Sequence, residues 1–270
     1  MNKHAHHLVE MFSIQGFIEV LHQVIFALPF VKALILYYVA VFLSNRRFRR
    51  WPYYRCIFWF FGVVSAAAAF LGPLAERAHV DFTVHMIVHL LLGMLSPLFI
   101  ALSAPMTLIF RTLNVSAARR ISMLIKSRFI RLFSDPVTAS LLNIGGLWVL
   151  YTTNLYIMMH QHFVIHIFIH IHVFLAGYLF TIAMIYIDPS SHRTSFFYRS
   201  AIFVFALAGH GILAKYIYAY PPDGVSTVQA ERGAIIMYYG GDIIDAIIIF
   251  IFCYQWYHSV RPRTSEAVYE

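Results

Sequence analysis

Long runs of apolar residues, separated by short polar segments, make up most of the chain. Seven runs are about 20 residues or longer, which is the length that an α-helix needs to cross the hydrocarbon core of a bilayer. They lie at about 23–43, 56–75, 84–110, 136–156, 163–187, 200–220 and 234–257. Strands of membrane β-barrels alternate polar and apolar residues over about 10 positions, and this sequence lacks that pattern. The hydrophobic pattern therefore predicts an all-α membrane protein with seven transmembrane helices.

The connections between these runs differ in charge. Arg and Lys are concentrated in alternate connections and in the C-terminal tail, at Arg46, Arg47, Arg49, Arg50, Arg55, Arg111, Arg119, Arg120, Lys126, Arg128, Arg131, Arg193, Arg199, Arg261 and Arg263. The other connections and the N-terminal segment hold only Lys3, Arg77 and Arg232. Since cytoplasmic loops of membrane proteins are enriched in Lys and Arg, we expect the basic connections to face the cytoplasm. Residues 1–22 then form an extracytoplasmic N-terminal segment, and residues 259–270 form a cytoplasmic tail.

The composition agrees with a membrane protein and changes how the net charge of the chain is interpreted. The chain is 60% hydrophobic and 12% charged, whereas a soluble domain carries roughly 25% charged residues. A net charge of +8 would suggest nucleic acid binding in a soluble protein. Here the basic residues lie where the positive-inside rule places them, so we predict no nucleic acid partner. Cys56 and Cys253 form no CxxC pair, and neither a disulfide framework nor a thiolate metal site follows from them.

The connection at 111–135 has a pattern of its own. It is both basic and amphipathic, which is typical of a helix that lies on a membrane surface. Anionic lipids on the cytoplasmic side attract such a helix. We therefore predict that this segment contacts membrane lipid rather than a protein partner.

The histidines are unusually numerous for so apolar a chain, which holds 15 of them. Two groups are spaced by four positions, so the members of each group share one face of a helix. The groups are Asp81, His85 and His89 on the third predicted helix, and His162, His166 and His170 on the fifth. His172 lies on the fifth helix as well and points to another side.

Their depths in the membrane overlap. At a rise of about 1.5 Å per residue, His89 and His170 would lie about 8–10 Å below the outer boundary, and Asp242 about 12 Å below it. Asp245 and His210 would lie near the midplane, at about 15 Å. Ionisable groups inside a bilayer normally face the interior of the bundle and pair with one another. We therefore expect imidazoles and carboxylates from four helices to converge.

This arrangement indicates a metal site. Two imidazoles spaced i, i+4 can bind one ion, and a ligand from another helix can complete the site. We predict the ligands His85, His89, His166 and His170. Further candidates for ligands, or for residues that support ligands, are Asp81, Met86, His162, His172, His210, Asp242 and Asp245. Met86 adjoins the first pair and Met158 and Met159 precede His160, and thioether together with imidazole suits Cu(I).

Other functions remain open at this stage. Three histidines and a carboxylate could hold zinc with one open position for water, and Asp242 or Asp245 could act as the base of a zinc hydrolase. Axial histidines on the third and fifth helices could instead face each other across a haem b. A transporter ranks last, because the sequence shows no internal repeat.

Segments around these histidines resemble a known family. The most specific are HMIVHLLLGMLSP at 85–97 and APMTL at 104–108. Supporting segments are Asp135-Pro136, His166 with His170 followed by FLAGYLF at 174–180, HGIL at 210–213 and IIMYYGG at 235–241. Together, over about 50–257, they resemble the seven-helix CtaG family of cytochrome c oxidase assembly factors of the Gram-positive type. The chain departs from the family pattern at Ile169, where the family often has an acidic residue, and at His172.

The resemblance implies a non-enzymatic role in building a haem–copper oxidase in the plasma membrane of a bacterium. It implies that copper is the metal, and that an oxidase subunit or another copper chaperone is the partner that receives it. On this hypothesis the copper would enter from the outer face and be held weakly at the helix ends, so that it could be passed on.

Overall fold

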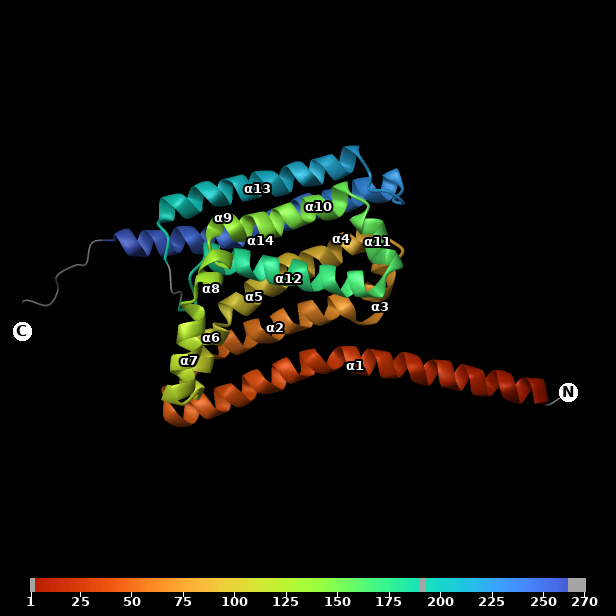
Figure 1. Ribbon diagram of the computed structural model, residues 1–270, viewed down its shortest axis with the longest axis horizontal. Coiled ribbons are helices and arrows are strands. Elements are labelled where there is room, and N and C mark those ends of the chain that lie inside the picture. Colours follow the sequence, from red (N-terminus) through yellow and green to blue (C-terminus); the bar gives the residue numbers. More distant parts are fainter. Residues whose placement is uncertain (1–2, 190–192, 262–270) are drawn as a thin grey trace, which may run out of the picture.

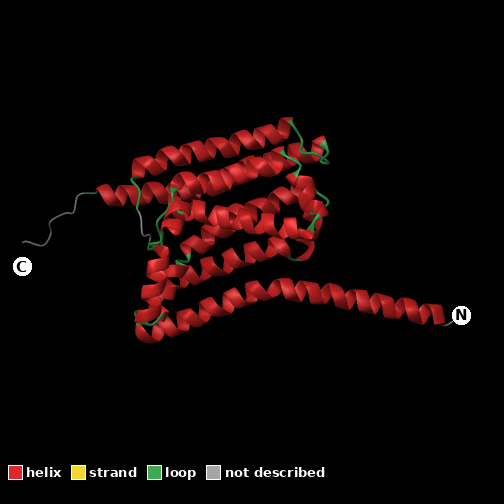
Figure 2. Cartoon of the chain, viewed as in Figure 1, coloured by secondary structure: helices red, strands yellow, loops and turns green. Residues whose placement is uncertain are grey.

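The computed structural model describes the backbone of residues 3–189 and 193–261, and side chains from Leu21 onward except His22. Every regular element in this part is helical (Figure 2). In chain order these are α1 (Lys3–Arg47), α2 (Tyr53–Phe70), α3 (Gly72–Ala78), α4 (Phe82–Leu90), the π-helical turn η1 (Leu91–Leu95), α5 (Ser96–Leu102), α6 (Pro105–Thr112), α7 (Val115–Ile125), α8 (Arg128–Phe133), α9 (Pro136–Ser140), the π-helical turn η2 (Leu141–Gly145), α10 (Gly146–Thr152), α11 (Leu155–Gln161), α12 (Phe163–Met184), α13 (Phe196–Ala219) and α14 (Thr227–Val260).

Six stretches of the described chain are long and apolar enough to cross a membrane. They are Gln23–Arg47, Tyr53–Phe70, Phe82–Leu102, Phe163–Met184, Phe196–Ala219 and Thr227–Val260. The chain is thus an all-helical membrane protein, as its hydrophobic pattern predicts. The remaining predicted span, 136–156, corresponds to α9, η2 and α10, which follow one another without a break over 136–152. This stretch is about 25 Å long at 1.5 Å per residue, so the seven-span count stays a prediction.

Two helix boundaries differ from those that hydrophobicity predicts. The first helix begins at Lys3 rather than near residue 23, and its N-terminal part extends beyond the other helices (Figure 1). The third span ends at Leu102 rather than at 110. Ala104 has a left-handed backbone with φ 51°, and Pro105 then opens α6, which leaves in a new direction. An apolar run alone does not reveal this break, because the residues of α6 are still largely apolar.

The bundle has two chemically different ends (Figure 1). The basic end comprises the C-terminal end of α1, the short helices α6, α7 and α8, and the start of α13. The histidine end lies opposite and comprises α3, α11 and the connection between α13 and α14. The predicted amphipathic segment forms α7 and α8 at the basic end, and α7 has no buried residue. Most of the described basic residues therefore lie at one end and most of the described histidines toward the other, with Arg77, Arg232 and His258 as exceptions.

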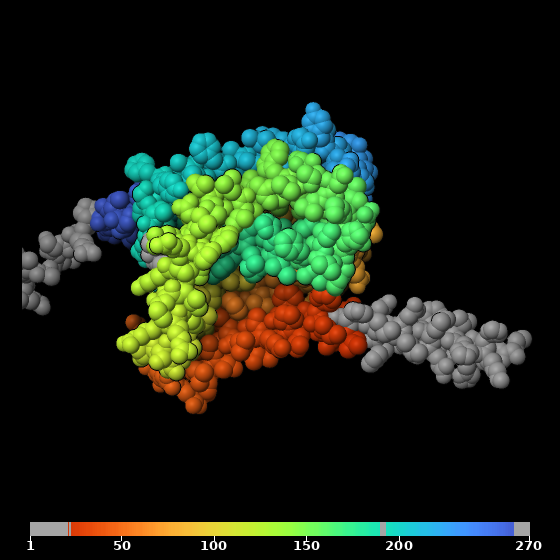
Figure 3. Space-filling view, in the orientation of Figure 1, coloured from red at the N-terminus to blue at the C-terminus, as the bar shows by residue number. Residues whose placement is uncertain are grey.

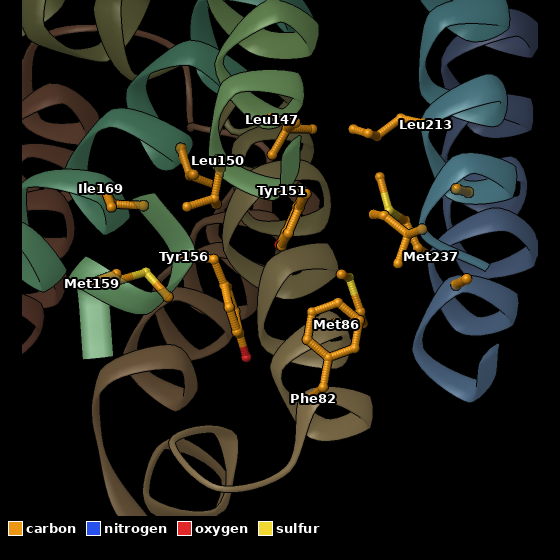
Figure 4. Packing of buried hydrophobic residues seen from close by; sticks show 14 residues of the cluster. Phe82, Met86, Leu147, Leu150, Tyr151, Tyr156, Met159, Ile169, Leu213 and Met237 are labelled. Atoms are coloured by element: carbon orange, nitrogen blue, oxygen red, sulfur yellow. The ribbon is translucent and has the colours of Figure 1, made fainter. Parts of the chain in front are cut away.

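Close helix packing holds the middle of the bundle together. A Cβ atom on Gly177 of α12 would collide with the carbonyl oxygen of Gly93 in η1, so only glycine permits this approach. An apolar cluster lies beside the buried histidines and contains Phe82, Met86, Tyr151 and Met237 (Figure 4). Side chains from α4, α10, α11, α12, α13 and α14 meet in this cluster. The contact between α12 and η1 fixes how the histidine-bearing faces of α4 and α12 oppose each other.

Candidate functional site

Three of the four predicted ligands surround one small cavity inside the bundle, which we call the inner cavity. His85 and His89 come from α4, and His170 comes from α12. Its other lining residues are Val88, Leu92, Leu150, Tyr151, Met159, Ile169 and Val173. Its volume is about 20 Å³, which exceeds the roughly 10–15 Å³ that a single water needs. The space therefore suits one water-sized particle among imidazoles.

Local sequence explains why His85 and His89 point into this cavity. Asp81 begins α4 as its N-cap, and its carboxylate accepts a hydrogen bond from the Thr83 amide at 2.8 Å. One and two helical turns later, His85 and His89 fall on the face of α4 that packs inward, and they are 6% and 5% exposed. Asp81 therefore acts as a helix cap and sets the start of α4.

The hydrogen bonds of the inner imidazoles leave nitrogen lone pairs available. His170 donates from Nδ1 to the carbonyl oxygen of His166 at 2.9 Å, which leaves its Nε2 unprotonated in the neutral ring. His89 Nε2 is buried and has no hydrogen-bond partner among the described residues. His85 Nε2 lies 3.1 Å from the hydroxyl of Tyr151. Two imidazoles thus offer free ligand atoms, and the third would exchange a hydrogen bond for a metal bond.

The fourth predicted ligand, His166, lies on the other side of the cavity wall. Its ring packs on that of His170 with centroids 4.0 Å apart, yet it lines an open cleft at the histidine end, which we call the outer cleft. The outer cleft has a volume of about 400 Å³ and also contains His79 and His160. Desolvation lowers the pKa of His79, and the neighbouring His160 lowers it further. The sequence-based ligand set therefore divides between two places.

Two more candidate residues, His210 and Asp245, lie deeper in the bundle next to His89. His210 of α13 and Asp245 of α14 line a second small cavity together with His89 and Asn143. The rings of His89 and His210 have centroids 6.4 Å apart. Gly241 makes room for His210, because a Cβ at that position would lie 2.5 Å from the imidazole Cε1. The deep histidine predicted on the sixth span therefore adjoins the inner cavity.

The remaining candidates occupy other places. Met86 is fully buried and packs with Phe82 against Gly233 (Figure 4). His162 is exposed at the start of α12, and Asp242 is exposed on α14. His172 donates from Nε2 to the Leu142 carbonyl at 3.2 Å, which ties α12 to η2. None of these four residues lines the inner cavity.

Three residues of the site fall outside the sequence-based set of candidates. They are His79, in the connection before α4, His160 on α11, and Met159, which lines both the inner cavity and the outer cleft. The segments that contain these residues are too short to show a periodic pattern. In the sequence, the adjacency of Met159 and His160 indicates two of the three, and nothing indicates His79. Within residues 3–189 and 193–261, no group of three His, Cys, Asp or Glu side chains has the geometry to hold a metal ion.

Comparisons with known proteins identify a family and several relatives. The model of the family described as cytochrome c oxidase caa3 assembly factor matches residues 35–259. Uncharacterized proteins of Mycobacterium bovis and Mycobacterium tuberculosis are each 33% identical to the chain over 158 residues, covering 55% of the chain and 24% of theirs.

An uncharacterized protein of Mycobacterium leprae is 26% identical over 241 residues, covering 81% of the chain and 37% of its own length. The chain thus spans well under half the length of these relatives. No solved structure matches it. Since the family model covers most of the sequence, including every histidine of both cavities, the chain belongs to the cytochrome c oxidase caa3 assembly factor family.

Proposed function

We propose that this chain binds copper at the histidine end of its bundle and delivers it to a cytochrome c oxidase subunit or to another copper chaperone. Membership of the family supports the role in oxidase assembly. The observation that carries the copper part is the inner cavity, where three imidazoles from two helices meet in a space of about 20 Å³. Copper is the cargo of this process, and no catalytic step is required.

The chemistry of the cavity fits Cu(I) best. Imidazole and thioether ligands are those that Cu(I) accepts, and both His170 and Met159 line the space. Apart from His85, His89 and the Tyr151 hydroxyl, the other walls are apolar, so a single positive charge is less costly to bury there than a double one. A volume of about 20 Å³ leaves no room for a porphyrin or a lipid-like substrate. The haem and zinc-hydrolase alternatives therefore receive less support from the geometry.

The two ends of the bundle give the direction of loading. With the basic end in the cytoplasm, the histidine end faces the extracytoplasmic side of a bacterial plasma membrane. Copper would then enter from outside and meet the outer cleft before the inner cavity. A short path from the membrane surface suits a protein that both takes up an ion and gives it away.

The test combines metal content with oxidase assembly. The full chain is purified in mild detergent after growth with copper, as wild type, as His85→Ala/His89→Ala and as the control His162→Ala, which removes an exposed histidine. We expect copper in the wild type and the control, and a loss of the tightly held copper in the double variant. Cells that contain only the double variant should assemble little active oxidase. A wild type without copper, or full assembly with the double variant, would overturn the proposal.

A further inference from the structure

We infer that His79, His160 and His166 form a second, solvent-open acquisition site for Cu(I), from which the ion passes by Met159 and His170 into the inner cavity. This inference rests on the proposed function, because it describes how the inner cavity is loaded. It assigns a role to two histidines and a methionine that the hydrophobic pattern alone does not single out.

The outer cleft is built from segments far apart in the sequence. His79 follows α3, His160 lies on α11 and His166 lies on α12, and the remaining wall includes Phe26 of α1 and Phe70 of α2. In the space-filling view, the surface of α11 and α12 lies above that of α1 at this end (Figure 3). The ring centroid of His79 is 4.7 Å from that of His166 and 6.1 Å from that of His160. Three imidazoles therefore border one open space of about 400 Å³.

Ring nitrogens of His160 and His166 are available to bind an ion. His160 donates from Nδ1 to the Tyr156 carbonyl at 2.9 Å, so Nε2 of the neutral ring keeps its lone pair. His166 Nδ1 is buried without a hydrogen-bond partner in the described part of the chain. His79 is exposed. Binding by all three needs rotation of their side chains, since metal–nitrogen bonds are about 2.0 Å long, and the open cleft gives His79 room to turn.

A carboxylate lies on the approach to His79. A groove of about 140 Å³ adjoins the outer cleft and shares Phe26, Phe70, Ala75 and His79 with it. This groove also contains Glu76, which is exposed. Arg77 follows Glu76 and is exposed as well, so the two charges offset each other. Glu76 thus contributes a carboxylate oxygen beside the entrance rather than a net negative charge.

Two contacts join the outer cleft to the inner cavity. Met159 is 1% exposed and lines both spaces, so its thioether belongs to the wall between them. The rings of His166 and His170 pack with centroids 4.0 Å apart, one bordering each space. An ion can therefore exchange one neutral ligand for another at each step. Cu(I) stays Cu(I), the imidazoles and the thioether stay neutral, and no proton or electron is transferred.

The experiment follows the transfer of Cu(I) from a coloured chelator complex to the full chain in mild detergent, recording both rate and final stoichiometry. For His79→Ala/His160→Ala, we expect the loss of one rapidly exchanging copper and a slowing of inner-cavity loading by about tenfold or more, since supporting residues of metal sites alone contribute about 10–100-fold. The variant Met159→Leu, which conserves volume, should keep the wild-type stoichiometry and slow inner loading to a similar extent. His162→Ala should behave as the wild type.

The outcomes separate this inference from the proposed function. If the outer double variant loads with wild-type rate and stoichiometry, the acquisition site is wrong while the inner site stands. An unchanged loading rate in Met159→Leu overturns the route by Met159. A wild type that takes no Cu(I) from the chelator removes the proposed function itself. Circular dichroism and gel filtration establish that each variant is folded, and His85→Ala/His89→Ala should retain the rapid outer copper.

Discussion

Histidine side chains line both the inner cavity and the outer cleft, but they are buried in the first and more exposed in the second. In the inner cavity, His85, His89 and His170 are 5–6% exposed and a space of about 20 Å³ separates them. In the outer cleft, His79 is exposed and the space is about 400 Å³. A buried ligand set excludes competing water and holds an ion longer, whereas an exposed set exchanges its ion readily. On the proposed function, burial rather than ligand type would distinguish the site that holds the ion from the site that captures it.

The two regions also differ in what supports them. The inner histidines lie within α4 and α12, whose orientation is fixed by the contact of Gly177 with η1. The outer histidines lie at the end of α3, on the short helix α11 and in the second turn of α12. Positions inside packed helices hold geometry more precisely than those at helix ends. Side chains in the outer cleft are thus freer to rearrange around an arriving ion.

The largest expected difference is all-or-none access to a membrane-impermeant thiol reagent. In a background where Cys56 and Cys253 are replaced by Ser, Ala75→Cys lies on the outer cleft and should be labelled from the extracytoplasmic side. Val88→Cys borders the inner cavity and should stay unlabelled in the folded protein. Arg120→Cys, on α7, should react only when the cytoplasmic side is opened.

Labelling is read by mass spectrometry on intact cells and on inverted vesicles. If Ala75→Cys and Arg120→Cys react from the same side, the orientation predicted from the basic loops is wrong. If Val88→Cys reacts as fast as Ala75→Cys, the inner cavity is no more protected than the outer cleft, and the comparison between the two fails.

Sequence reasoning accounts for much of the fold because hydrophobic length is a direct consequence of bilayer thickness. Six of the seven apolar runs form stretches long enough to span a membrane. Two helix boundaries predicted from hydrophobicity are wrong, and each error has a local cause. The run 84–110 is apolar throughout, and the left-handed backbone of Ala104, followed by Pro105, ends the span early. A search for apolar runs does not detect the extension of α1 to Lys3, because residues 3–22 are more polar than the rest of the helix.

For the site, the i, i+4 spacing places His85 and His89 on one face of α4, and both line the inner cavity together with His170. His166, the fourth predicted ligand, lines the outer cleft instead. Metal binding by these four histidines stays a prediction. The spacing places His166 and His170 on the same face of α12, yet two residues on one face can border different cavities. Which cavity each residue borders depends on the rotation of α12 about its axis, and the contact between Gly93 and Gly177 sets this rotation. His79 is absent from the sequence-based candidates because tertiary packing alone brings it to the site.

The second prediction disturbs the support of the inner cavity. Gly177→Ala places a methyl group against the Gly93 carbonyl, so α12 must move away from η1. We expect the free energy of unfolding in detergent to fall by about 1–3 kcal/mol or more, as in other overpacked cores. Because α12 carries His170, the tightly held copper should be lost as well. Gly145→Ala is the matched control, since no atom beyond its own helical turn lies within 4 Å of a Cβ there, and it should be neutral or slightly stabilising.

Thermal unfolding followed by circular dichroism, together with copper analysis, measures both effects. Retention of the tightly held copper by a destabilised Gly177→Ala would show that the inner ligands do not depend on the position of α12. That result would contradict the distinction between a rigid inner cavity and an adaptable outer cleft.

The smallest expected effect isolates one hydrogen bond of the inner cavity. Tyr151→Phe removes the hydroxyl that lies 3.1 Å from His85 Nε2. A typical hydrogen bond contributes about 0.5–1.5 kcal/mol, so the metal-free protein should lose about that much stability. Copper binding then no longer has to break this bond. The affinity of the inner cavity for Cu(I) should therefore rise by about fivefold, which corresponds to about 1 kcal/mol.

A tyrosine nearby provides the control for this substitution. Tyr156 packs its ring on His85 with centroids 5.2 Å apart, so Tyr156→Phe keeps the ring contact and removes a different hydroxyl. Chelator competition should show a tighter site in Tyr151→Phe and an unchanged one in Tyr156→Phe, while the rapid outer copper is the same in both. A weaker inner site in Tyr151→Phe would mean that the Tyr151 hydroxyl supports the bound ion instead of competing with it for His85. His85 would then act by orienting Tyr151, and the ligands of the inner cavity would reduce to His89 and His170.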